Sequence, residues 1–217
     1  MSGVKAWRTR HGVPLIDHKP LRVSQTIVWG DIMVLGANTL VNRLVLATDA
    51  YLEDIAKGLW GFAWHDITVD ANGALTQTIP STVETAAAVI HPIPSFSRLM
   101  HRLSQPLIGT TPDIGNIEMQ VCVFTDDLEV LMDVSSSEGV ATVTQAIVGE
   151  FYGLVNDGGV YKVDLATAAS VTEAAVQVME VDTTQTNFNV SAETNNAVWV
   201  RVRAAAQQYN NGSVPHT

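Results

Sequence analysis

The chain has 217 residues, of which 47% are hydrophobic and 16% charged, and its formal net charge is −10. This acidity argues against a nucleic-acid-binding protein, and no apolar run approaches the roughly 18 residues of a membrane-spanning helix. We expect no secretory signal at the N-terminus, which has no apolar segment, and the single cysteine, Cys122, excludes an internal disulfide or a site built from several cysteines.

The first 22 residues are basic, unlike the rest of the chain. Their basic residues are Lys5, Arg8, Arg10, Lys19 and Arg22. With Asp17 the segment has a net charge of +4, whereas the remaining residues carry −14. We predict that residues 1–22 form an extended arm that lies on another, negatively charged surface. A solvated tail is the alternative that the composition leaves open.

Residues 23–90 alternate short apolar runs with turn signals, which predicts a first β subdomain. One run ends at Gly30-Asp31, the next ends at the sequence GANT, and LVNRLVLA then resumes an extended segment. Residues 48–58 are typical of one short helix, since Thr48 or Asp49 can cap its start and a glycine can end it.

The sequence GLWGFAWHDI, residues 58–67, is the most aromatic stretch of the chain. At the strand period of two, Trp60, Phe62 and Trp64 share one face, and the opposite face is nearly bare. We predict a strand that forms a hairpin within residues 59–79 around the turn sequence DANG. Its bulky face fills a core within the chain or a contact between chains, and its bare face allows a close neighbour.

Residues 91–115 contain four prolines and resemble no sheet interior, because proline cannot donate a ladder hydrogen bond. We predict a linker between two β subdomains. Arg98, His101 and Arg102 make it the second basic island of the chain, which favours a further contact segment.

Residues 116–205 return to strand-like patterns and predict a second β subdomain. IEMQVCVF and LEVLMDV are typical of one hairpin, and residues 149–165 of another, around the turn sequence NDGG. Residues 175–182 and 197–206 predict two more strands, before a polar tail at 206–217. The fold class that we predict is mainly β, barrel-like or sandwich-like, with one or two short helices.

Catalytic patterns are missing from the sequence. It contains no Gly-rich phosphate loop, no nucleophile elbow and no metal-ligand spacing of its six histidines. Asp126 and Asp127 are adjacent, as are His65 and Asp66, and neighbours on a strand point to opposite faces. We therefore predict no catalytic residues, no cofactor and no metal.

Two parts of the chain, residues 23–67 and 147–203, resemble head-decoration (cement) proteins and other structural proteins of tailed bacteriophages. In the first part Gly30 and Asp31 introduce a strand pair, and a Gly-hydrophobic-Ala strand at 61–63 follows a short acidic spacer. In the second part the hairpin FYGLVNDGGVYKVDL precedes AVQVMEVD and AVWVRVRA, which is similar to a pattern in phage structural proteins.

The resemblance implies a non-enzymatic virion protein, made in the host cytoplasm, that binds the capsid exterior and ties capsomers together. It implies that the major capsid protein is the partner and that the chain forms a homo-oligomer, with a trimer favoured and a dimer possible. It also implies that the arm lies across the capsid protein or adds a strand to it. The residues that we expect to bind this partner are Lys5, Arg8, Arg10, Lys19, Arg22, Arg98 and Arg102.

Two other readings remain open. A head–tail connector or tail protein would also be a rigid β protein of the virion. A cupin-like or glycan-binding β-barrel would instead need a histidine–carboxylate cluster, or exposed tryptophans among Trp60, Trp64 and Trp199.

Overall fold

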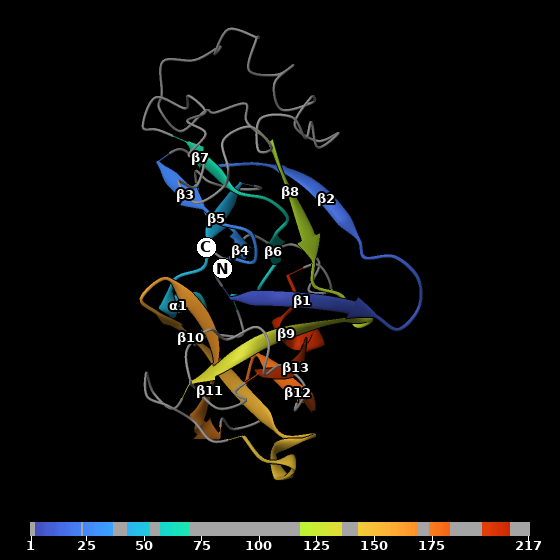
Figure 1. Cartoon of the computed structure of the whole chain (residues 1–217). Coiled ribbons are helices and arrows are strands. Elements are labelled where there is room, and N and C mark those ends of the chain that lie inside the picture. The colour runs from blue at the N-terminus through green and yellow to red at the C-terminus, as the bar shows by residue number, and fades with distance from the viewer. Residues whose placement is uncertain are drawn as a thin grey trace, which may run out of the picture.

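The computed structural model describes residues 3–22, 24–36, 43–52, 57–69, 118–135, 143–168, 174–182 and 197–208. These residues are mainly β and form several sheets, with helical segments of three or four residues, which confirms the predicted fold class (Figure 1). The helical segments are α1 (Asp49–Leu52) and the 3-10 turns η2 (Gln145–Ile147) and η4 (Ala204–Ala206).

The largest sheet has six strands in the order β1-β9-β11-β10-β12-β13. These strands are β1 (Val4–Thr9), β9 (Leu128–Ser135), β10 (Phe151–Asp157), β11 (Val160–Ala168), β12 (Val176–Asp182) and β13 (Ala197–Val202). Since β9 pairs with both β11 and β13, the last five strands close into a small barrel, and β1 is added along β9.

A second sheet has five strands in the order β2-β8-β6-β4-β5, and a third has only β3 and β7. The strands of the second sheet are β2 (Ile16–Pro20), β4 (Ile32–Leu35), β5 (Leu44–Leu46), β6 (Gly61–Ala63) and β8 (Glu118–Val123). Those of the third are β3 (Gln25–Ile27) and β7 (Ile67–Val69). Figure 1 shows the second sheet between the six-stranded sheet and the β3–β7 pair.

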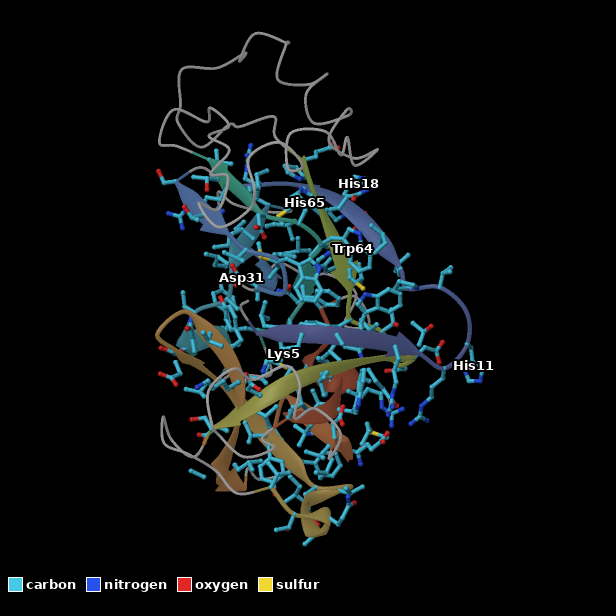
Figure 2. The ribbon with its side chains drawn as sticks, viewed as in Figure 1. Lys5, His11, His18, Asp31, Trp64 and His65 are labelled. Carbon is cyan, nitrogen blue, oxygen red and sulfur yellow. The ribbon has the colours of Figure 1, made fainter. Side chains whose placement is uncertain are left out.

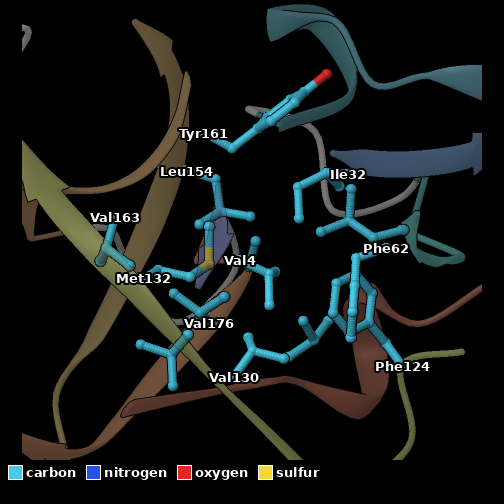
Figure 3. Close-up of a cluster of buried hydrophobic side chains, with 14 of the residues drawn as sticks. Val4, Ile32, Phe62, Phe124, Val130, Met132, Leu154, Tyr161, Val163 and Val176 are labelled. Carbon is cyan, nitrogen blue, oxygen red and sulfur yellow. The ribbon is translucent and has the colours of Figure 1, made fainter. Parts of the chain in front are cut away.

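Two hydrophobic clusters follow from this layering. The first fills the barrel and the space between it and the second sheet, where Phe62 and Phe124 meet Val4 and Val130 (Figure 3). The second lies on the opposite face of the second sheet and includes Trp60. Both faces of this sheet are therefore covered at β4, β5 and β6, which explains why these three strands are apolar throughout.

The hairpin of residues 149–165 is confirmed, as β10 pairs with β11 in antiparallel register. Gly158 and Gly159 adopt positive φ angles of 59° and 93°, which glycine tolerates best. The strands predicted at 175–182 and 197–206 are also present, and they pair with each other. The valines of β13 face the core, as their alternation indicates.

The hairpin predicted from IEMQVCVF and LEVLMDV is wrong. β8 pairs with β2 and β6, whereas β9 lies in the six-stranded sheet. The turn begins at Thr125, whose carbonyl accepts from Leu128 N–H, and it carries the chain from one sheet to the other. Alternation shows that Met119, Val121 and Val123 share the buried face of β8, but it does not reveal which strands β8 pairs with.

The aromatic stretch is a strand, but its faces differ from the prediction. Phe62 belongs to the first cluster and Trp60 to the second, because the regular strand begins only at Gly61. β6 and β7 do not pair with each other, and the predicted return strand after residue 69 lies outside the described residues. The close neighbour expected on the bare face is β8 of the same chain.

The predicted helix of residues 48–58 begins as expected. α1 starts at Asp49, and Thr48 C=O accepts the N–H of Tyr51 and Leu52. Gly58 has a φ of 68°. Residues 53–56 lie outside the described part of the chain, as does the linker of residues 91–115.

The predicted subdomain boundaries do not separate the sheets. β8, from the predicted second subdomain, lies between β2 and β6 in the sheet formed by the first, and β1, from the predicted arm, extends the sheet of the second. The first hydrophobic cluster is continuous across both halves because strands of each half contribute side chains to it.

Three glutamine side chains connect segments that strand pairing leaves apart. Gln25 accepts from Leu46 N–H and donates to Leu44 C=O, so its amide acts as one more strand residue beside β5. Gln208 does the same with the N–H and C=O groups of Leu35. Residues 206–208 of the predicted polar tail are therefore buried, and Gln207 also bonds to the Val202 carbonyl.

We predict that Gly61→Ala destabilises the fold by about 2–3 kcal/mol, because an added Cβ would lie 2.1 Å from the Cys122 carbonyl oxygen. Gly153→Ala is the matched control, since Gly153 also lies in a strand and a Cβ there meets nothing within 4 Å. Urea unfolding of both variants measures the difference. Equal midpoints would contradict the close β6–β8 approach.

Candidate attachment surface

The predicted arm is extended, and its described part belongs to the body of the protein. β1 pairs with β9 and β2 pairs with β8, so the two halves of the segment lie in different sheets. Val4 N–H also bonds to Gly30 C=O, which fixes the start of β1 against the second sheet.

Arg8 and Arg10 converge on one buried carboxylate. Arg8 lies directly opposite Glu129 in the β1–β9 register, and its Nε lies 2.8 Å from Glu129 Oε2. The Nε of Arg10 lies 2.8 Å from the other carboxylate oxygen. The second side of Arg8 reaches Glu180 at 2.7 Å, and its guanidinium lies 4.3 Å from the centre of the Trp199 ring.

The two arginines set the charge state of Glu129. Burial alone would raise the pKa of this carboxyl, because its side chain is only 4% exposed. Hydrogen bonds and charge interactions with Arg8 and Arg10 outweigh burial and hold the pKa below its ordinary value. The carboxylate is therefore charged and paired within the chain.

The other predicted contact residues have different surroundings. Lys5 Nζ lies 2.5 Å from Asp133 Oδ1. Lys19 lies 3.2 Å from Asp17 and 5.2 Å from the centre of the Trp60 ring. Arg22 is exposed, and its backbone N–H bonds to Leu44 C=O. Arg98 and Arg102 lie outside the described residues.

The structure thus brings Lys5, Arg8 and Arg10 together with carboxylates of the same chain. Sequence reasoning missed the acidic partners Glu129 and Asp133, because only the pairing of β1 with β9 places them opposite the basic strand. The acidic residues of LEVLMDVS, which share one face of the strand, were the signal that could have indicated a basic neighbouring strand. The incorrect hairpin instead gave this strand a different partner. Binding a partner through these cations would require breaking existing pairs.

The outer edge of β2 is poorly suited to accept another strand. Val123 N–H donates to Leu15 C=O, so the alternation of an antiparallel pair turns the N–H of His18 away from β8. That N–H already donates to Asp17 Oδ1 at 2.8 Å, and Pro20 has no N–H. Side chains and proline protect this edge, as on many natural edge strands.

The connection between β1 and β2 is the most exposed apolar feature of the described residues. It spans residues 10–15 and projects from the body at the side where β1 and β2 meet (Figures 1 and 2). Val13 is 90% exposed and Leu15 40%. We call residues 10–15 the projecting loop.

The projecting loop is held at both ends and along its length. Arg10 binds Glu129, and His11 Nδ1 lies 3.2 Å from Asp127 Oδ1. Thr9 Oγ1 donates to Gly12 C=O, and Gly12 adopts a φ of 101°. Since its two ends enter different sheets, the loop presents Val13 in a defined position.

Metal ligands, tryptophans and the thiol are the groups that the alternative chemistries would use. No group of three or more histidine, cysteine or carboxylate side chains there could hold a metal ion. Trp60 is buried, and Arg8 covers one face of Trp199. Burial raises the pKa of the Cys122 thiol to about 12. None of the helical turns described has the length or hydropathy that crossing a bilayer requires.

No protein-family model matches the chain, and comparisons with curated proteins and with solved structures found no significant similarity.

We predict that Glu129→Gln lowers the free energy of unfolding by about 2 kcal/mol at neutral pH, because it removes a buried charge that two arginines bind. Glu180→Gln, which removes a 54% exposed partner of the same Arg8, is the control and should cost less than about 1 kcal/mol. Chemical denaturation of both variants provides the measurement, and equal losses would refute the special role of Glu129.

The same carboxylate should give the protein an acid limit. A folded-state pKa below the unfolded value means that stability is present above about pH 4.5 and is lost as the pH falls through the folded pKa. In Glu129→Gln this part of the pH dependence should disappear. Thermal unfolding between about pH 3 and pH 6 tests this, and parallel curves for the two proteins would contradict it.

Proposed function

We propose that the protein is a non-enzymatic structural protein of a tailed-phage virion, which binds the outer surface of the capsid and stabilises contacts between capsomers. The proposal rests first on the resemblance of residues 23–67 and 147–203 to decoration and related phage proteins. It is supported by the mainly β body and by a projecting loop that exposes apolar side chains.

The observation that carries the attachment mode is the exposure of Val13 and Leu15 on a constrained loop. Apolar side chains on a constrained loop lose little conformational entropy on binding. The favourable free energy of burying them is therefore offset less by ordering than it would be on a flexible loop. The basic residues of the segment stabilise the loop from within the chain. We therefore assign the contact with the major capsid protein to the projecting loop, with Arg98 and Arg102 as a predicted second contact.

A loop with two large apolar side chains gives weak binding as a single contact. Several copies linked in one homo-oligomer would bind together, and the second and third contacts would then cost little additional entropy. This argument favours the proposed trimer, or a dimer, over a monomer. It also fits a location on the virion exterior, where capsid subunits repeat at fixed spacing.

Capsid binding tests the proposal directly. Expanded capsids that lack the protein should bind the purified chain in a sedimentation assay, and Val13→Asp should weaken binding by tenfold or more, about 1.4 kcal/mol per contact. Val148→Asp is the matched control, because Val148 is an exposed valine, at 39%, far along the chain. Loss of binding in both variants, or in neither, would reject the loop as the contact.

Binding of the wild-type chain decides the broader proposal. Saturation at a copy number that scales with the capsid surface supports a decoration protein. A small fixed copy number at one vertex would instead identify a head–tail connector, and absence of binding to any capsid would refute both.

A further inference from the structure

His65 follows β6, and its side chain is half-buried. Its Nδ1 is buried and has no hydrogen-bond partner among the described residues. Burial lowers the pKa of this imidazole; the neighbouring Asp66 opposes that effect, and His18 adds to it. Protonation of His65 would therefore leave a buried N–H at Nδ1 without a hydrogen-bond acceptor, which is unfavourable.

The titratable group on β2 whose charge acts on His65 is His18, and both histidines are labelled in Figure 2. Its Nε2 lies 2.9 Å from Nε2 of Gln120 on β8, opposite it in the β2–β8 register. An uncharged His18 ring accepts this bond from the amide. A protonated ring can only donate, so the Gln120 amide would have to turn over.

The described carboxylates near His18 and His65 are already bound to other groups and would not neutralise the positive charge of both protonated rings. Asp66 is exposed and already accepts the Trp29 N–H at 2.6 Å. Asp17 binds Lys19 and the His18 N–H, and Glu118 lies across from Pro20 at the far end of β2. A positive charge on His18 thus opposes protonation of His65.

We propose that His18 and His65 form an acid-sensitive latch that holds β2 on β8 when both are neutral and releases it when they are protonated. β2 is an edge strand with β8 as its only strand partner among the described strands, so it can separate while the rest of the sheet remains paired. Its release would free one end of the projecting loop. The latch is a property of the isolated chain; its use in detaching the protein from a capsid rests on the proposed function.

The sign of the effect follows from linkage. With a folded pKa below the unfolded value of about 6.5, His65 contributes stability that is complete above that pH and lost as the pH falls below it. Acid should therefore open β2 in a range well above that in which Glu129 takes up a proton.

Amide hydrogen exchange of the full-length chain tests the latch without any capsid. We expect the protection of residues 16–20 to fall by about tenfold or more between about pH 7.5 and pH 5, after correction for intrinsic rates, while β10 and β11 stay protected. His65→Asn and His18→Gln should each reduce this loss. His11→Asn is the control, since His11 is 79% exposed on the projecting loop and should leave the loss unchanged.

Equal protection of β2 at both pH values in the wild-type chain would overturn the proposal, as would a loss that persists in both latch variants. If one variant does not fold, the other decides. Because the readout is exchange within the isolated chain, a negative result here leaves capsid binding untouched, and a failure of capsid binding leaves the latch standing.

Discussion

The division of the N-terminal segment between two sheets is the constraint on which the rest of the structure depends. β1 covers one edge of β9, and after the six residues of the projecting loop β2 covers one edge of β8. Both strands place apolar residues against the shared core, where Val4 is fully buried. This arrangement ties the barrel to the second sheet, positions the projecting loop, and explains why the basic residues lie opposite acidic ones of the same chain.

Local patterns predicted the elements better than their partners. The NDGG hairpin and the buried face of β13 could be predicted from the sequence, because turn residues and alternating valines are both local patterns. The pairing of β8 could not be predicted, since alternation shows which face of a strand is buried but not which strands lie beside it. The same holds for Gly61, whose need for a bare backbone was predictable, whereas the identity of its neighbour, the Cys122 carbonyl, follows only from tertiary structure.

The candidate site shows a similar division. Composition identified a basic segment, and the structure places its charges, yet their partners Glu129 and Glu180 lie more than a hundred residues away in the chain. The exposure of Val13 could not be inferred either, because nothing in the sequence HGVPL distinguishes a projecting tip from a buried turn. Both the partners of the basic residues and the exposure of Val13 depend on how the sheets are placed in the folded protein. The bond between His18 and Gln120 has the same origin, as it forms only because β2 pairs with β8.

The glutamine amides beside β5 and at Leu35 have a consequence for how the protein behaves in concentrated solution. Each occupies backbone groups that a strand from another molecule could otherwise bind, so two neutral side chains protect these positions from edge-to-edge association. Salt, which screens repulsion, leaves this protection in place. Hydrolysis of either amide to a carboxylate would remove the donor and place a negative charge beside a backbone carbonyl. The strand edge would then lose its protection, so deamidation during storage should promote aggregation.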